Sequence, residues 1–206
     1  MTSRRKRPPI PLTIRLPWRW RRFGPVVILV TLAVGAIAGD HFRHSAARIG
    51  NDIGRYHDKS FSVDRVVDGD TVDVAVPDGD RPTTRIRLWG VDCPELARDG
   101  KEAMYFGPRA ADFARRTLDG RRVNVVLWPD RTRDKYGRLL AYLHLERGGP
   151  MFNEMLVENG FAYADTRFDH PFRQRFETTE KLAQRSAVGL WQSGFPPDAP
   201  EWRKRP

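Results

Sequence analysis

The sequence predicts an α+β domain in which a small closed β-barrel is supported by helices. Three observations lead to this prediction. Short runs rich in β-branched and aromatic residues recur between residues 61 and 145, and turn residues separate them. Stretches with apolar residues at helical spacing interrupt and follow these runs. A chain of 206 residues provides one well-buried core of ordinary size, and it is too short for two such domains with linkers.

The first three strands are predicted at residues 61–67, 71–76 and 83–90. Asp68-Gly69-Asp70 separates the first two, and the turn Pro77-Asp78-Gly79-Asp80 precedes the third. Short connections of this kind join antiparallel neighbours. The segment therefore predicts a three-strand meander.

The remaining elements alternate between helix and strand. A helix is expected from Pro108 to Gly120, strands at 123–128 and 138–145, and helices at 153–159 and 171–187. Five strands, with one helix after the third and two helices at the end, favour an OB-fold barrel with three helices.

The N-terminus carries most of the positive charge. The net charge is +10, and the segment before Asp40 holds eight basic residues and no acid, so the rest of the chain is left with +2. Attraction of the folded domain for a polyanion must therefore come from local arginines. The single cysteine, Cys93, excludes an intramolecular disulfide.

An uncharged run of 17 residues, 23–39, follows the basic segment and spans about 25 Å as a helix. It predicts one transmembrane helix with a cytoplasmic N-terminus, so that the later domain is extracytoplasmic. The alternative is a signal sequence cleaved near Ala38, which would release a secreted protein. The expected organisation is a basic segment at 1–22, this helix at 23–39, a linker or juxtamembrane helix at 40–58, the main domain at 59–195 and a proline-rich tail at 196–206.

Two aspartates stand where predicted strands begin and end. Asp70 precedes the second strand and Asp92 follows the third, so a meander brings them together. Facing carboxylates repel, and a hard cation between them relieves the repulsion. A set of carboxylate, carbonyl and water oxygens suits calcium or magnesium rather than zinc. We therefore expect Asp70 and Asp92 to be metal ligands.

Three further side chains fit phosphodiester hydrolysis at that metal. Arg87 and Arg138 carry guanidinium groups that match phosphate oxygens and neutralise the charge gained when water attacks phosphorus. Glu95 lies three residues after Asp92 and is the expected general base. A role for Glu95 in orienting water alone remains the alternative.

These residues lie in motifs that resemble the staphylococcal nuclease, or thermonuclease, family. The similarity runs from about Phe61 to Trp191. Its carriers are VVDGDT, IRLWGVDCPE, YFGPRA, DKYGRLLAYL, FNEMLVENGFA and the final GLW.

The resemblance implies a calcium-dependent nuclease that cleaves DNA or RNA and leaves 3′-phosphate ends. It implies that the backbone carbonyl of Cys93 joins Asp70 and Asp92 as a calcium ligand, although the family often has threonine at this position. It also implies that Lys135 and Tyr136 contact a terminal phosphate of the substrate. The nuclease domain is expected to be monomeric, and no protein partner is inferred.

Two alternatives to an enzyme are a catalytically inactive OB-fold module that binds nucleic acid or protein, and a cell-surface scaffold. The first predicts that at least one of the acids and arginines has been lost, and the second explains the anchor but not the acid and arginine set. All five expected side chains are present, which favours hydrolysis.

Overall fold

A computed structural model describes residues 47–97 and 100–204, and the elements discussed below belong to the unit Arg48–Pro206. The basic segment 1–22 and the expected transmembrane or signal helix 23–39 lie outside the described residues. Within the described ranges, no helix is both long enough and apolar enough to cross a bilayer.

The domain contains seven strands and several helices. Their bounds in chain order are β1 (Lys59–Val66), β2 (Thr71–Val74), β3 (Thr84–Leu88), β4 (Val91–Asp92), α2 (Gly107–Leu118), β5 (Arg122–Val126), β6 (Leu139–His144), α3 (Phe152–Glu158), β7 (Tyr163–Ala164), α4 (Arg173–Arg185), the 3₁₀-helix η1 (Gly189–Trp191) and α5 (Glu201–Lys204).

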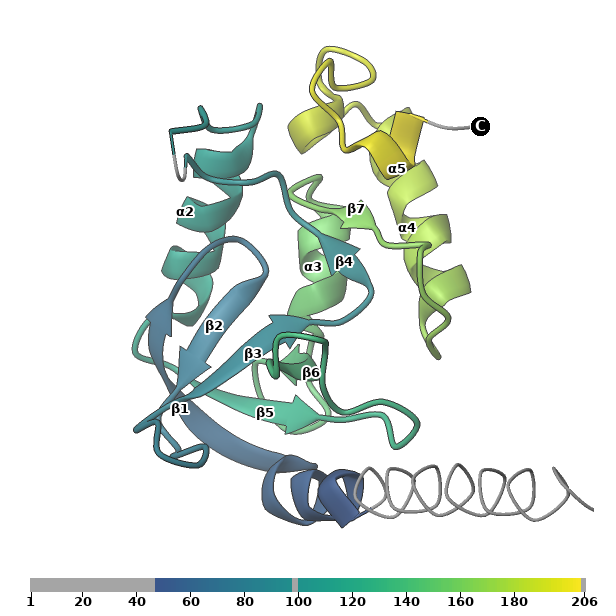
Figure 1. The fold of residues 1–206 in the computed structure, drawn as a ribbon. Coiled ribbons are helices and arrows are strands. Elements are labelled where there is room, and N and C mark those ends of the chain that lie inside the picture. Colours follow the sequence, from purple (N-terminus) through teal and green to yellow (C-terminus); the bar gives the residue numbers. More distant parts are fainter. Residues whose placement is uncertain (1–46, 98–99, 205–206) are drawn as a thin grey trace, which may run out of the picture. The chain divides into compact units, whose positions relative to one another are not determined.

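Five strands close into a barrel in the order β1-β2-β3-β6-β5 (Figure 1), and β5 returns to pair with β1. The expected α+β class and five-stranded OB-fold barrel are confirmed. β2 is buried at all four positions, because its side chains meet the barrel interior on one face and neighbouring segments on the other. Closure leaves β1 and β5 without free edges along their paired residues.

One pairing in the barrel is parallel. β3 and β6 run side by side with Arg87 opposite Leu140, although these residues are 53 positions apart in the sequence. A parallel pair needs a crossover connection. Here the crossover contains β4, α2 and β5, so α2 is placed beside the barrel by the same connection that closes it.

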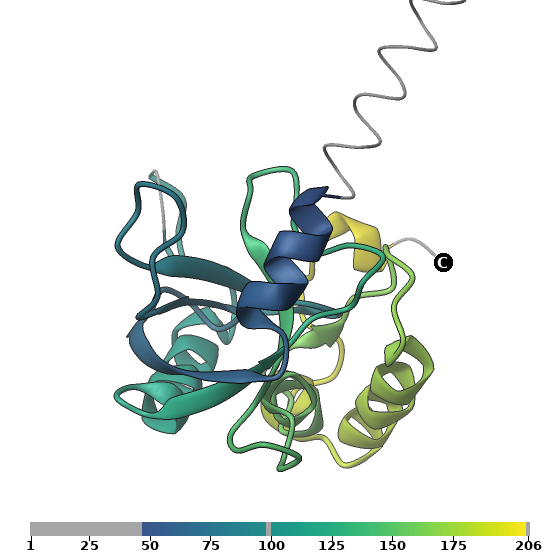
Figure 2. The same cartoon turned by 90° about the horizontal axis from the view of Figure 1, so that it is seen from below.

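The three larger helices pack at one end of the barrel. Figures 1 and 2 agree in placing α3 between α2 and α4. α2 is amphipathic because Ala110, Ala114 and Leu118, spaced by four residues, form one apolar stripe, and all three are fully buried. α3 contributes Phe152 and Leu156 to the same core cluster.

Residues 47–56 form a helix against the opposite end of the barrel (Figure 2). Tyr56 is buried in the core, and Asp52 receives hydrogen bonds from Thr132 and from Arg133. The sequence predicts either a linker or a juxtamembrane helix for residues 40–58. The described part is mostly helical and packs on the barrel through Tyr56.

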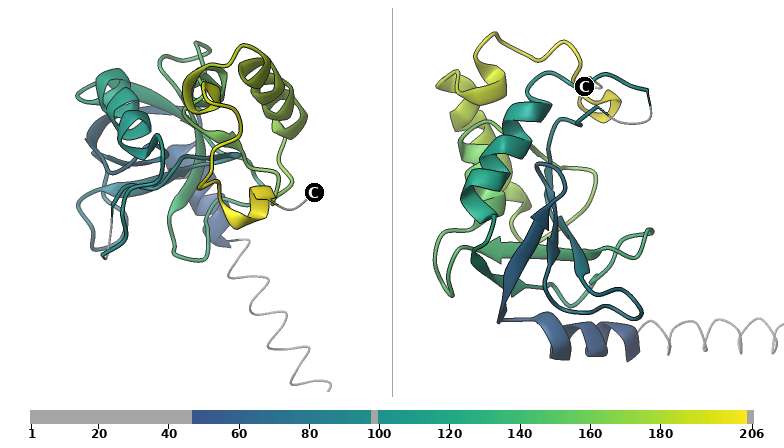
Figure 3. Two further views of the ribbon diagram at one scale, coloured as in Figure 1. Left: turned by 90° about the horizontal axis from the view of Figure 1, so that it is seen from above. Right: turned by 90° about the vertical axis from the view of Figure 1, so that its left-hand side faces the viewer.

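Two features of the fold were not anticipated. β4 and β7 form a second, two-stranded sheet that pairs Asp92 with Tyr163. The second feature is the packing of the proline-rich tail expected at 196–206. Its Ala199 is buried with Trp191 in a second apolar cluster, and α5 follows it in the chain (Figure 3).

Candidate active site

A cavity of about 580 Å³ opens at the rim of the barrel, where β2, β3, β4 and the loop before β6 meet. Seven of the eight predicted site residues line it. They are Asp70, Arg87, Asp92, Glu95, Lys135, Tyr136 and Arg138. The eighth, Cys93, is buried immediately behind the cavity wall.

Strand register explains this convergence. Thr71 pairs with Arg87, so Asp70 lies at the end of β3, where its carbonyl accepts a 2.8 Å hydrogen bond from the amide of Leu88. Arg87 also lies opposite Leu140. Residue 138 is two positions earlier, so it falls on the same face of the sheet as Arg87.

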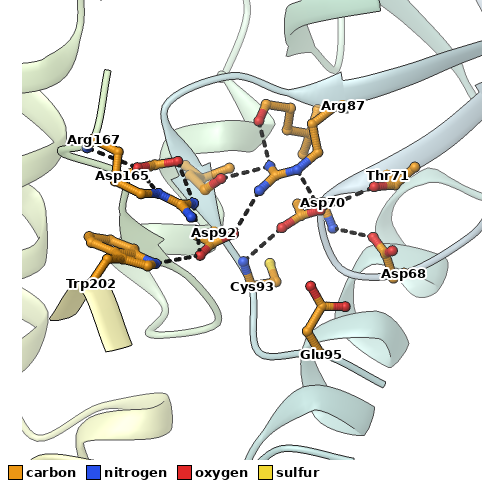
Figure 4. A network of polar contacts seen from close by, with 12 residues as sticks. Asp68, Asp70, Thr71, Arg87, Asp92, Cys93, Glu95, Asp165, Arg167 and Trp202 are labelled. Atoms are coloured by element: carbon orange, nitrogen blue, oxygen red, sulfur yellow. Dashed lines mark hydrogen bonds and ion pairs between the residues drawn. The ribbon is translucent and has the colours of Figure 1, made fainter. Parts of the chain in front are cut away.

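Arg87 is the centre of the site (Figure 4). Its Nε lies 3.2 Å from Oδ1 of Asp70, and its Nη2 lies 2.8 Å from Oδ1 of Asp92. Its Nη1 donates to the carbonyls of Leu88 and Val91, both at 2.7 Å. Burial alone would lower the pKa of Arg87, but the two carboxylates outweigh it and raise this pKa. Arg87 therefore stays charged and links both acids.

The carboxylate of Asp70 contacts three partners, Arg87, Cys93 and Thr71. Its Oδ2 accepts a 2.7 Å hydrogen bond from the backbone amide of Cys93, and the hydroxyl of Thr71 donates to Oδ1. Burial and the nearby charge of Asp68 raise the pKa of Asp70 to about 6, and Arg87 opposes this shift. A nearby positive charge therefore favours the ionised form of Asp70.

The two oxygens of Asp92 have different partners. Oδ1 faces Arg87, while Oδ2 lies 3.0 Å from Nη2 of Arg167 and accepts a 3.0 Å hydrogen bond from the indole Nε1 of Trp202. Burial and the charge of Asp70 raise the pKa of Asp92, and Arg87 and Arg167 oppose that rise.

Glu95 lies below Asp70 and Asp92 in Figure 4, and its carboxylate points toward Asp70 and Cys93. Its backbone carbonyl accepts a hydrogen bond from the amide of Met104. Gly107 approaches the same carbonyl so closely that an added Cβ would lie 2.3 Å from it. The start of α2 therefore fixes the position of the Glu95 backbone.

Arg138 enters the cavity from the polar loop before β6. Its Nε donates to Oδ2 of Asp134 at 2.7 Å, and its guanidinium lies 5.5 Å from the ring centre of Tyr136. Lys135 lies 5.0 Å from the same ring. Tyr136 is 67% exposed, so this rim combines two cations with an open aromatic face.

The chemical type of the donor atoms at this site suits a hard cation. Asp70 and Asp92 offer carboxylate oxygens, and their raised pKa values reflect buried charge that a divalent cation would compensate. Within residues 47–97 and 100–204, however, no group of three or more histidine, cysteine, aspartate or glutamate side chains is arranged to hold a metal ion. Arg87 contacts both aspartates and provides the positive charge between them.

One side of the cavity, formed by the residues that follow β7, was not predicted from the sequence. Asp165, Arg167 and Phe168 line the same cavity, together with Arg131 from the loop before β6. The guanidinium of Arg131 lies 5.3 Å from the ring centre of Phe168, which is 44% exposed. The β4–β7 pairing brings this segment to Asp92, but two-residue strands carry no readable periodicity. The available signal was an arginine next to an aromatic residue in a polar segment.

Comparison with known proteins agrees with this architecture. Residues 85–193, more than half of the chain, match the family described as staphylococcal nuclease homologue. The chain belongs to this family. It is 30% identical to the thermonuclease of Staphylococcus hyicus over 168 residues, which cover 81% of this chain and 96% of that protein.

Two further relatives carry nuclease names. The thermonuclease of Staphylococcus intermedius is 36% identical over 137 residues, covering 65% of this chain and 77% of that protein. Endonuclease YhcR of Bacillus subtilis is 34% identical over 145 residues, covering 65% of this chain and 11% of that protein. The similarity to YhcR therefore concerns a small part of that longer protein.

Proposed function

We propose that this protein is a calcium-dependent nuclease that hydrolyses phosphodiester bonds of DNA or RNA. The observation that supports it most is that two aspartates, Glu95 and two arginines, from separate segments, line one cavity. The thermonuclease and endonuclease names of its relatives support the same reaction class.

Asp70 and Asp92 would hold the calcium ion, together with the backbone carbonyl of Cys93. Carboxylate and carbonyl oxygens are the ligands that calcium takes in proteins. When bound, the ion supplies positive charge that polarises a phosphoryl oxygen. The amide of Cys93 already donates to Asp70, which orients that carboxylate from behind.

Arg87 and Arg138 bind the phosphate in this proposal. Arg87 lies in β3 and Arg138 immediately precedes β6, the parallel neighbour of β3, and both residues line the cavity. A guanidinium is a planar fork of donors that matches two phosphate oxygens. Four of the five N–H groups of Arg87 already face protein oxygens, so Arg87 would exchange a carboxylate contact for the phosphate. When a fifth oxygen approaches phosphorus, the added negative charge falls between the two cations, so the transition state gains more than the bound substrate.

Glu95 accepts the proton of the attacking water as the water oxygen bonds to phosphorus; the P–O5′ bond breaks, and the 5′ oxygen takes a proton from solvent and leaves as a hydroxyl. Its carboxylate borders the cavity at the end nearest Asp70. A positioned base of this kind contributes roughly 10²- to 10⁴-fold. Lys135 and Tyr136, at the open rim, contact a terminal phosphate of the substrate, and the cleaved strand keeps a 3′-phosphate.

The nuclease domain is proposed to act outside the cytoplasm. The basic segment followed by the uncharged run at 23–39 supports a membrane anchor, and cleavage near Ala38 would give a secreted form instead. Fractionation of expressing cells distinguishes the two. A soluble mature chain beginning at Gly39 would contradict the anchor.

A digestion assay tests the enzymatic proposal. The full-length chain is incubated with single-stranded DNA, duplex DNA and RNA, with calcium or with a chelator, and acid-soluble nucleotides are measured. We expect release with calcium only. Glu95→Gln should lower kcat by roughly 10²-fold or more, because it removes the base and keeps the shape of the side chain.

A matched arginine pair tests the phosphate contacts. Arg138→Ala should abolish release, whereas Arg147→Ala should not, because Arg147 is an exposed arginine that pairs with Asp58 and does not line the cavity. Binding of nucleic acid without release, under all conditions, would contradict the enzyme and support the inactive binding module.

A further inference from the structure

The C-terminal tail is anchored on both sides of Trp202. Before it, Asp198 accepts a hydrogen bond from the backbone amide of Tyr105. After it, Nη2 of Arg203 lies 2.8 Å from Oε2 of Glu180 in α4. Glu180 is buried, and its other oxygen accepts a hydrogen bond from the amide of Ala164 in β7. The tail is therefore bound to the segment that precedes α2 and to α4.

Between these anchors, Trp202 reaches Asp92. Its indole Nε1 donates to Oδ2 of Asp92 at 3.0 Å, and Nη2 of Arg167 lies 3.0 Å from the same oxygen. The guanidinium of Arg167 also lies 4.6 Å from the Trp202 ring centre, so each partner orients the other. Figure 4 shows Trp202 and Arg167 on one side of Asp92 and Arg87 on the other.

The two oxygens of the Asp92 carboxylate therefore bind different partners. Oδ2 is occupied by Trp202, which lies outside the cavity, and by Arg167, which lines it, and Oδ1 faces Arg87 within the cavity. An indole N–H only donates, so it can hold a carboxylate oxygen and cannot compete for a cation. Trp202 itself does not line the cavity.

We propose that Trp202 is a positioning residue, which with Arg167 fixes the Asp92 carboxylate so that Oδ1 is presented to the cation. The proposal rests on the calcium-dependent function proposed above. Partners that hydrogen-bond to metal-ligating groups set their orientation, and their loss typically lowers metal affinity about 10- to 100-fold. The tail is thereby part of the metal site although it contributes no ligand.

Two tryptophan-to-phenylalanine variants of the full-length chain test this role. Trp202→Phe keeps an aromatic ring over Arg167 and removes only the donor to Asp92. Trp128→Phe is the matched control, because its indole also donates to an aspartate, Asp130 at 3.1 Å, on an exposed loop. Calcium affinity is measured by titration calorimetry without nucleic acid, and kcat and KM are measured at saturating calcium.

We expect Trp202→Phe to raise the calcium Kd about 10-fold or more. Trp128→Phe should leave it unchanged. The KM for nucleic acid at saturating calcium should stay at the wild-type value, because Trp202 does not border the cavity. A tail that only stabilised the fold would instead lower the unfolding midpoint without changing the calcium Kd of the folded protein.

The outcomes separate the two proposals. Wild-type calcium affinity in Trp202→Phe would overturn the role of Trp202 and leave the nuclease proposal standing. A wild-type chain that binds no calcium would overturn the metal-dependent function and this inference with it. If Trp202→Phe fails to fold, a chain ending at Ala199 provides the second measurement, and unchanged calcium affinity there would also refute the proposal.

Discussion

Replacing Arg87 by methionine should destabilise the protein far more than the same change at Arg138. Arg87 is 13% exposed, contacts two buried carboxylates and donates to two backbone carbonyls. Removing one partner of a buried ion pair leaves uncompensated charge and costs about 3–5 kcal/mol. For a chain of this size each kcal/mol lowers the midpoint by about 2–4 °C, so the expected loss is about 6–20 °C.

Arg138 is the control in this comparison. It is 27% exposed and pairs with Asp134 at the cavity rim, where an ion pair contributes about 0–1 kcal/mol. Arg138→Met should therefore lower the midpoint by no more than about 4 °C. Both variants should lose nuclease activity, so the unfolding midpoint, and not the activity, distinguishes the two arginines.

Calcium should stabilise Arg87→Met at least as much as it stabilises the wild type. A ligand at 100 times its Kd adds about 2.7 kcal/mol, and the variant has lost the cation that contacts both aspartates. Thermal unfolding followed by circular dichroism, with calcium and with chelator, measures both effects. Equal midpoints for Arg87→Met and Arg138→Met in chelator would refute the reasoning.

Three further predictions follow from burial and close packing. The thiol of Cys93 should resist alkylation until the protein unfolds, because burial raises its pKa well above the usual value; modification of the native protein, seen by mass spectrometry, would contradict this. Burial lowers the pKa of His170, so its contribution to stability is complete above about pH 6.5 and falls as the pH drops toward the lower folded value. The unfolding midpoint of the wild type should therefore fall more between pH 7 and pH 5 than that of His170→Gln, and parallel curves would show that His170 does not titrate as described. Gly107→Ala places a Cβ 2.3 Å from the carbonyl oxygen of Glu95 and should lower kcat roughly 10²-fold by displacing that backbone. Gly54→Ala, where an added Cβ meets nothing within 4 Å, is the control for initial rates, and equal rates in the two variants would argue against this displacement.

The barrel was predictable from sequence because its strands carry strong local signals. The β-branched runs, and the turns at Asp68-Gly69-Asp70 and Pro77–Asp80, gave the meander. The apolar spacing ending at Gly120 gave α2. These elements are confirmed to within a few residues. The expected domain boundaries and the helix at 23–39 remain predictions.

The rest of the site depends on tertiary contacts that leave little trace in the sequence. β4 and β7 have two residues each, which is too short for a period to be read. Trp202 lies in a proline-rich, charged tail whose composition is typical of exposed chain. The aspartates, arginines and Glu95 were found because their chemistry is distinctive. Trp202 was not, because its part in the site is visible only from its distance to Asp92, and Arg167 had only the weak signal of an arginine beside an aromatic residue.

The parallel pairing of β3 with β6 also governs when the protein becomes competent during synthesis. The two proposed phosphate-binding arginines belong to segments separated by about a quarter of the polypeptide, and they become neighbours only when the barrel closes. A nascent chain that has emerged as far as β5 holds the acids and Arg87 but lacks Arg138. Trp202 is made later still. The hydrolytic centre is therefore assembled only after β6 has been made and has paired with β3.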